Sequence, residues 1–255
     1  MKKQDNTLVS IITPTYNSSK YIKETIESVL EQTYTQWELV ITDDCSSDNT
    51  ANIVKHFQST DSRIKFYQLE KNSGAAVARN NSIKNSKGVF LAFLDSDDLW
   101  YETKLQSQLK FMGSEIHFSF TAYQYIDKSS VIKNKTVDSS NSGDFSYTDM
   151  LKKKATLGCS TVILRKEKFD DLMMPNIRTG QDYAFWLKLL KTGSKAYIYN
   201  SILTKYRITP DSISSNKFKK ATRQFYIYRK IEGINFFNSI YYFLHYAFRA
   251  VFRRN

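Results

Sequence analysis

The sequence predicts an α/β protein with a mainly parallel sheet flanked by helices. Through the first hundred residues, short β-branched or aromatic runs alternate with amphipathic helical stretches. This alternation requires crossover connections, which place helices on both faces of a parallel sheet. With 255 residues, 41% of them hydrophobic and 24% charged, the chain can bury a full core. We therefore expect one large domain, or one domain with an appendage.

The first elements follow one another in regular order. Residues 8–12 ("LVSII") form a β-branched run that stops at Pro14, as expected for a buried strand ended by a turn. In residues 20–32 the apolar positions fall on one face of a helix. The pattern then repeats, predicting strands at 37–41, 64–69 and 89–94 and helices at 48–57 and 74–86.

The second half is less regular. Residues 114–127 alternate apolar and polar side chains, which predicts a half-buried strand. Residues 128–144 are rich in Ser, Asn and Lys and are expected to form a loop, whereas residues 159–164 ("CSTVIL") predict another strand. Residues 179–191 carry Leu at helical spacing and predict an amphipathic helix.

The last forty residues differ in composition. From position 216 onward the chain holds nine Lys or Arg and one acid, Glu232, and is dense in Phe and Tyr. Residues 234–252 predict an aromatic helix too polar for a membrane span. Such a helix fits the headgroup region of a membrane. The alternative is that its aromatic side chains pack on the domain or on a second subunit.

Polar or acidic segments follow each of the first four predicted strands. They are "TPTYN" (13–17), "DDCSSD" (43–48), "KNSGAAVARN" (71–80) and "DSDD" (95–98). In open α/β sheets ligands bind outside the carboxyl ends of the strands, so these segments are expected to share one pocket.

Three carboxylates lie within four positions, and their negative charge must be neutralised. Asp95, Asp97 and Asp98 repel one another unless a cation lies between them or they take up protons. Carboxylate oxygens suit Mg²⁺ or Mn²⁺, and substrate phosphates and water can complete the coordination shell. The alternative for Asp98 is to cap a helix that begins near Leu99.

In this order and spacing, "VSIITPTYN", "WELVITDDCSSDNT", "NSGAAVARN" and "FLDSDDLW" resemble the family 2 glycosyltransferases, which are inverting enzymes of the Rossmann-like GT-A fold. The resemblance covers about four fifths of the chain. It implies a glycosyltransferase domain over 1–215, with a nucleotide-sugar-binding half (1–110) and an acceptor-binding half (111–215). The basic, aromatic, helical tail over 216–255 lies outside that domain.

The resemblance also implies where a nucleotide sugar and its metal bind. Asp43 would accept a hydrogen bond from the base, with Asp44 as the next candidate. Arg79 would lie near the base or the phosphates, unless it is a surface residue of its helix. Asp97 would ligate the Mn²⁺ or Mg²⁺ that holds the diphosphate. The remaining positions assigned to nucleotide binding are Pro14, Tyr16, Gly74, Asp95 and Ser96.

For the catalytic base the resemblance points to Asp182 in "TGQDYAFWLKLLK", with Trp186 behind it helping to seat the helix and the acceptor. The alternative is that Asp182 only favours the first turn of its helix. Arg207 in "YRITPDSIS" could reach a phosphate or close a loop over the donor. Many relatives carry a His shortly after this Tyr-Arg pair, where the sequence has Ile208 or Thr209.

Together these features predict an inverting glycosyltransferase that uses a UDP-sugar and a glycan or lipid-linked acceptor in bacterial envelope polysaccharide synthesis. A sugar nucleotidyltransferase is the alternative enzyme, although "TPTYNSSKY" lacks the glycine-rich loop of that class. The net charge of +12 also allows a basic membrane- or nucleic-acid-binding protein. We expect no nucleic acid, because the strand ends are acidic. Two cysteines and the lack of a secretory signal predict a cytoplasmic protein, at the inner face of the membrane.

Overall fold

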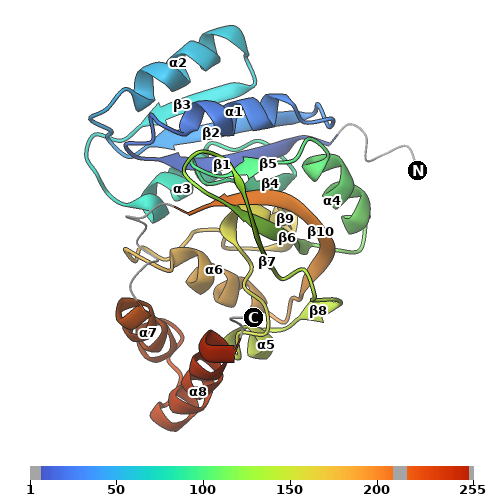
Figure 1. Ribbon diagram of the computed structural model, residues 1–255, viewed down its shortest axis with the longest axis vertical. Helices are drawn as coiled ribbons and strands as arrows, with labels where there is room; N and C mark the ends of the chain where they lie inside the picture. The colour runs from blue at the N-terminus through green and yellow to red at the C-terminus, as the bar shows by residue number, and fades with distance from the viewer. Residues whose placement is uncertain (1–6, 209–216, 253–255) are drawn as a thin grey trace.

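The computed structural model describes residues 7–208 and 217–252, in which helices surround one mixed sheet (Figure 1). The strands are β1 (Val9–Thr15), β2 (Trp37–Asp43), β3 (Ile64–Gln68), β4 (Phe90–Phe93), β5 (Leu99–Trp100), β6 (Phe118–Ile126), β7 (Ile132–Val137), β8 (Asp144–Phe145), β9 (Ile163–Arg165) and β10 (Ala196–Arg207). The helices are α1 (Ile22–Leu30), α2 (Thr50–Thr60), α3 (Ala75–Lys84), α4 (Lys104–Met112), α5 (Tyr147–Leu151), α6 (Gln181–Leu190), α7 (Lys217–Tyr226) and α8 (Phe236–Phe252). The sheet runs in the order β3-β2-β1-β4-β9-β6-β10-β5, with β7 beside β6 and β8 beside β10.

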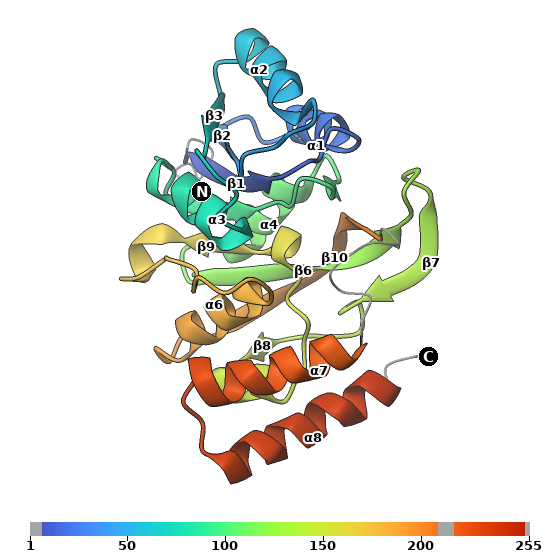
Figure 2. The same ribbon diagram turned by 90° about the vertical axis from the view of Figure 1, so that its left-hand side faces the viewer.

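The amino-terminal half is a parallel sheet covered on both faces (Figure 2). Successive residues of a strand point to opposite faces, so Ile11 and Ile12 enter different cores. Ile11 belongs to the cluster that includes Ile22 of α1 and Val54 of α2. Ile12 belongs to the cluster that includes Ala76 of α3 and the apolar face of α6. The predicted α/β architecture is confirmed.

The second half of the sheet is mixed. β9 pairs antiparallel with both β4 and β6, whereas β10 runs parallel to β6 and antiparallel to β5. Every residue from Phe118 to Tyr123 is buried, so β6 is more than half-buried, because it lies inside the sheet with both neighbours present. This half brings α6 beneath the carboxyl ends of the parallel strands (Figure 1).

Three local expectations are wrong. Residues 128–144 contain β7 and the first residue of β8 instead of a continuous loop, because pairing with β6 and β10 stabilises these short strands. Residues 159–164 begin with a 3₁₀ turn, Cys159–Thr161, and enter a strand only at Ile163. No helix begins near Leu99 in the described chain, since Leu99 and Trp100 pair with β10 and α4 begins at Lys104.

The tail packs on the domain through one of its faces. A π-helical turn, Ile227–Ile231, joins α7 to α8, and the two helices lie side by side (Figures 1 and 2). Ile227 and Tyr228 belong to the larger core cluster, and the Tyr228 hydroxyl donates to the Leu151 carbonyl at 2.6 Å. The predicted tail helix is confirmed as α8. The predicted boundary at 215/216 lies outside the described residues.

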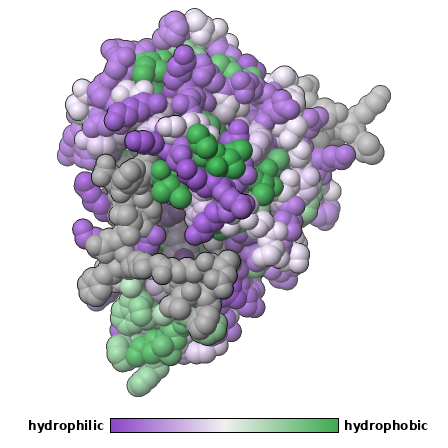
Figure 3. All heavy atoms as spheres, viewed as in Figure 1, coloured by the Kyte–Doolittle hydropathy of each residue, from purple (hydrophilic) through white to green (hydrophobic). Residues whose placement is uncertain are grey.

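The other face of α8 is exposed. Its large side chains at successive turns form a stripe that we call the α8 stripe: Phe236, Phe237, Ile240, Tyr241, Leu244 and Phe248. The green patch at the lower end of the space-filling view lies over this pair of helices (Figure 3). Within the described residues, no helix is both long and apolar enough to span a bilayer.

Candidate active site

A cavity of about 740 Å³ opens where β1, β2 and β4 end, and we call it the donor cavity. Eight of the residues predicted to bind nucleotide or metal line it: Pro14, Tyr16, Asp44, Gly74, Arg79, Asp95, Ser96 and Asp97. They come from four segments that are up to 80 residues apart in the sequence, and the parallel sheet brings them together. The expectation that these strand ends share one pocket is confirmed.

Asp43 does not line the donor cavity. Its side chain is fully buried, and the protein itself occupies its carboxylate oxygens. The backbone N–H of Ser46 and the amide of Gln68 each donate to Oδ2 at 2.9 Å, and the Ser46 hydroxyl donates to Oδ1. Asp43 therefore shapes the turn after β2, and the neighbouring Asp44 is the carboxylate that faces the cavity.

Asp44 ties the second strand end to the third. Its carboxylate accepts hydrogen bonds from the backbone N–H groups of Ser73 and Gly74, at 2.7 and 2.8 Å. Gly74 has φ +96°, in the region that favours glycine, and it immediately precedes α3. The glycine thus lets the chain turn sharply beside the cavity, with its backbone N–H donating to Asp44.

Arg79 is a buried cation on the wall of the cavity. It is only 5% exposed, so the alternative of a surface arginine is wrong. Its Nη2 donates to the carboxylate of Asp95. Within the described chain its Nε and Nη1 are buried without a hydrogen-bond partner. Because unpaired buried donors are destabilising, this arrangement favours a polar or anionic ligand.

Asp97 is the acid best placed to meet a cation. Burial, together with the Asp95 carboxylate, raises its pKa to about 6. In the part of the chain that the structure describes, no cluster of three or more His, Cys, Asp or Glu could hold a metal by itself. The carboxylate oxygens of Asp95 and Asp97 therefore fit a hard divalent cation only as part of a shell, with ligand oxygens and water supplying the remainder.

Asp98 points away from the cavity. It is 1% exposed and accepts hydrogen bonds from the Ser160 hydroxyl at 2.6 Å and from the backbone N–H of Arg207 at 2.8 Å. Burial, reinforced by the charges of Asp97 and Asp95, raises its pKa well above the ordinary value. Asp98 anchors the acidic loop to β10 and the turn before β9.

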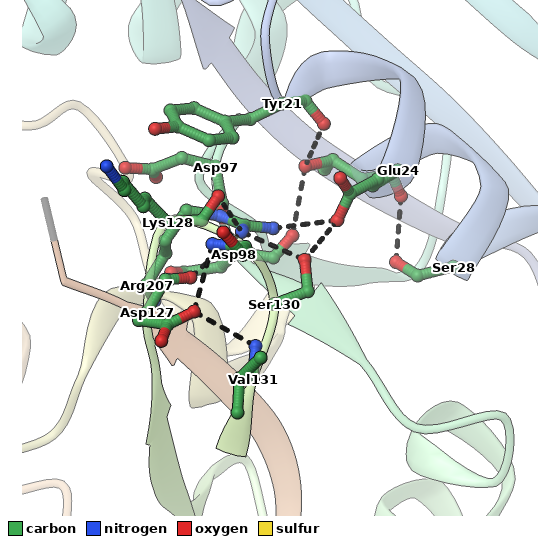
Figure 4. Close-up of polar contacts among 12 residues, drawn as sticks. Tyr21, Glu24, Ser28, Asp97, Asp98, Asp127, Lys128, Ser130, Val131 and Arg207 are labelled. Atoms are coloured by element: carbon green, nitrogen blue, oxygen red, sulfur yellow. Dashed lines mark hydrogen bonds and ion pairs between the residues drawn. The ribbon is translucent and has the colours of Figure 1, made fainter. Parts of the chain in front are cut away.

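Arg207 holds the same loop from below (Figure 4). Its side chain is fully buried. Nε donates to the Asp97 carbonyl at 2.7 Å, Nη2 pairs with Glu24 at 3.0 Å, and Nη1 donates to the Ser130 hydroxyl at 2.9 Å. The guanidinium also lies over the ring of Tyr21. It therefore positions the acidic loop between α1 and the β6–β7 turn and does not line the donor cavity.

Asp182 and Trp186 lie on α6, as predicted. Asp182 is half-buried in the first turn, near enough for its charge to act on Arg79. Trp186 is fully buried, with its ring 5.3 Å from that of Phe93 and 5.5 Å from that of Phe118. It seats the helix, as expected, but burial excludes it from contact with an acceptor.

Nine lining residues were not predicted, among them the larger polar side chains of Tyr21, Asn72, Arg178 and Gln181. Asn72 and Gln181 lie inside segments that the sequence singled out. Arg178 is four residues before Asp182, and a cation so close to a candidate base was an available signal. Tyr21 immediately precedes α1, where only the fold places it over the cavity.

Comparison with known proteins agrees with this geometry. The model of glycosyl transferase family 2 matches residues 10–173. A Bacillus subtilis protein named as teichuronic acid biosynthesis glycosyltransferase TuaG is 44% identical, with 97% of each chain covered. Escherichia coli WfgD, named as a UDP-Glc:α-D-GlcNAc-diphosphoundecaprenol β-1,3-glucosyltransferase, is 41% identical, covering 86% of this chain and 85% of WfgD.

A solved structure of Staphylococcus aureus TarS 1-349 in complex with UDP-GlcNAc superposes with a TM-score of 0.73, at 24% identity, covering 88% of this chain and 65% of that TarS chain. This likeness shows the GT-A fold. Since the family model spans more than half of the sequence and the relatives match nearly their whole length, the chain is a member of glycosyl transferase family 2.

Proposed function

We propose that this glycosyltransferase moves a sugar, with inversion, from a UDP-sugar to a hydroxyl of a lipid-linked glycan in bacterial surface polysaccharide synthesis. The observation that carries the proposal is the donor cavity, which gathers an exposed aromatic ring, a buried arginine with unpaired donors and three acidic residues. This set matches the base, phosphates and metal of a nucleotide sugar.

The nucleoside binds at the rim and the inner wall of the donor cavity. Tyr16 is 49% exposed, which leaves its ring free to stack on the base. Asp44 is the carboxylate that accepts the imide N–H of uracil, in place of Asp43, because it lines the cavity. Arg79, whose Nε and Nη1 have no hydrogen-bond partner within the described residues, would donate to base or phosphate oxygens. Pro14 and Gly74 allow close approach of the backbone, and Asp95 and Ser96 lie where the ribose would follow.

Asp97 would hold Mn²⁺ or Mg²⁺ when the donor diphosphate is bound. When bound, the cation offsets the negative charge that grows on the leaving diphosphate. The raised pKa of Asp97 supports this role, since a carboxylate crowded by Asp95 gains from a nearby positive charge.

Asp182 takes the proton from the attacking acceptor hydroxyl. A carboxylate can accept this proton as a general base. Asp182 does not itself line the donor cavity, but it follows Gln181, which does, in the first turn of α6, and the buried Trp186 fixes that helix. Inversion follows if the hydroxyl attacks opposite the leaving diphosphate.

The acceptor is carried on a lipid and the enzyme works at the membrane surface. WfgD by its name uses a GlcNAc-diphosphoundecaprenol acceptor, and it covers most of this chain. The α8 stripe offers apolar side chains to a bilayer without spanning it. The two free cysteines fit the reducing cytoplasmic side.

Calorimetric titration of UDP, GDP and dTDP tests the donor site. We expect UDP binding that requires Mn²⁺ or Mg²⁺, is lost in EDTA, and is lost in Asp97→Asn. Binding of none of the three nucleotides in any condition would refute the proposal. A UDP-sugar screen with a lipid-diphosphate-linked GlcNAc acceptor then tests transfer, and the anomeric configuration of the product tests inversion.

Vesicle co-sedimentation tests the membrane contact. The double variant Phe237→Ser/Leu244→Ser changes two exposed residues of the α8 stripe and leaves Tyr228 in the core. We expect it to lose binding to vesicles that contain phosphatidylglycerol, while UDP affinity stays unchanged. Equal vesicle binding by the variant and the wild type would refute the contact.

A further inference from the structure

A second cavity, of about 640 Å³, lies between the loop before α6 and one side of α7. We call it the basic cavity. The residues that matter for its chemistry are Arg178, Thr179, Lys219, Thr222, Arg223 and Tyr226. In the described part of the chain, its lining contains three cations, two hydroxyls and a tyrosine, but no acid.

The positive charge here is concentrated by the sequence of α7. The helix "KFKKATRQFY" carries four Lys or Arg and no acid. Burial, together with the charge of Arg223, lowers the pKa of Lys220 on the same helix. Like charges held this close favour an anion between them. Arginine guanidinium groups suit phosphate oxygens because they donate in pairs.

The basic cavity adjoins the reaction centre. Arg178 lines both this cavity and the donor cavity. Arg223 packs against Gly180, so closely that its Cδ would lie 3.0 Å from a Cβ added there. Gly180 begins α6 and stands two residues before Asp182. An anion held by Arg178 and Arg223 would therefore lie close to the first turn of α6, which carries the proposed base.

We propose that the basic cavity binds the diphosphate group of the lipid-linked acceptor, which deepens the proposed function and rests on it. A diphosphate between sugar and lipid carries two negative charges in tandem, and the cavity offers cations from two walls, the loop before α6 and α7. The α8 stripe lies on the helix that packs beside α7, so the lipid chain has an apolar surface to follow. The acceptor sugar would then extend towards Asp182.

The donor diphosphate occupies a different place. In the proposed function it is held with a metal at Asp97, in the donor cavity, whereas the lining of the basic cavity, within the described residues, offers cations and hydroxyls but no carboxylate for a metal. Binding of the acceptor diphosphate should therefore not require a divalent metal. This difference separates the two sites experimentally.

Calorimetric titration of inorganic pyrophosphate in EDTA tests the basic cavity. We expect wild-type protein to bind it more tightly than orthophosphate, and Arg178→Gln and Arg223→Gln each to weaken binding about tenfold or more, as for the loss of a charge-assisted hydrogen bond. Lys219→Gln, an exposed change, is a second variant that should weaken binding without affecting the packing on Gly180.

Two controls keep the sites apart. Lys55→Gln removes one charge from α2, at the far end of the molecule from α7, and should leave pyrophosphate binding unchanged (Figure 1). Arg79→Gln changes the donor cavity and should also leave it unchanged. Pyrophosphate binding that depends on Arg79 but not on Arg178, Arg223 or Lys219 would overturn the inference, as would no binding by the wild type.

Vesicles that contain phosphatidylglycerol distinguish an acceptor diphosphate from ordinary lipid headgroups. If Arg178→Gln and Arg223→Gln reduce vesicle binding but pyrophosphate does not bind, the basic cavity serves bulk lipid and the inference is overturned. UDP titration with Mn²⁺ on the same proteins distinguishes a failure of the proposed function from a failure of the acceptor site alone. If UDP fails to bind, the proposed function fails. If UDP binds and the arginine variants bind pyrophosphate normally, only the acceptor site is refuted.

Discussion

Asp97→Asn should stabilise the metal-free protein while abolishing its metal-dependent nucleotide binding. The pKa of Asp97 is about 6 in the folded protein, against an ordinary 3.8. The folded state therefore holds more protons than the unfolded chain between these values, and the free energy of unfolding falls as pH rises through this window. At pH values above this window, the difference between the two pKa values lowers the free energy of unfolding by about 3 kcal/mol. Asparagine carries no charge at any pH, so the variant escapes this penalty.

Urea unfolding in EDTA measures the effect. The variant should exceed the wild type by up to about 3 kcal/mol near pH ~8, and by only about 1 kcal/mol near pH ~4.5, where the wild-type carboxyl is largely protonated. Comparing the two proteins at each pH removes the contribution of the other carboxylates. Mn²⁺ should raise the stability of the wild type at pH ~8 and leave the variant unchanged. A variant less stable than the wild type at both pH values would refute the reasoning.

Three further variants test other parts of the site. Asp182→Asn should leave the UDP dissociation constant unchanged but lower transfer by about 100-fold or more, since it removes the general base; near wild-type turnover would reject the assignment. Arg79→Gln should weaken UDP binding about tenfold in calorimetry, because it removes the buried donors, and equal affinity would contradict their role. Gly180→Ala should lower the free energy of urea unfolding by about 1–3 kcal/mol, because φ is +76° and Arg223 leaves no room for a methyl group. An unchanged unfolding midpoint would show that the loop relaxes freely.

Much of the fold can be read from the sequence because its elements follow their own periodicities. β1, β2 and β4 are buried along their whole length, and α1 and α2 are amphipathic, so local pattern and tertiary role agree in these elements. β7 could not be predicted, because five of its six residues are exposed and its sequence, "IKNKTV", lacks alternation. β5 has only two residues, and pairing with β10 alone makes it a strand.

The candidate site also contains some residues that the sequence predicts and others that it does not. Residues in strand-end motifs were predicted because a parallel sheet brings its carboxyl ends together. The different roles of Asp43 and Asp44 were not predicted. Neighbouring residues alternate in direction, and only the packing decides which one faces the cavity. The place of Arg207 depends on contacts with residues 77 to 183 positions away in the sequence, which no local pattern encodes.

The three carboxylates of the acidic loop resolve into three different environments. Asp95 is paired with Arg79, and Asp98 is held by Ser160 and the backbone of Arg207. In the described chain no other side chain donates to the carboxylate of Asp97, whose backbone carbonyl is nevertheless fixed by the Arg207 guanidinium. The pKa values of Asp97 and Asp98 are both raised, but Asp98 is buried away from the cavity, so the electrostatic penalty that a bound ligand can relieve lies at Asp97. Because a bound cation would remove that penalty, the free energy that destabilises the empty loop becomes available to bind the metal and its diphosphate.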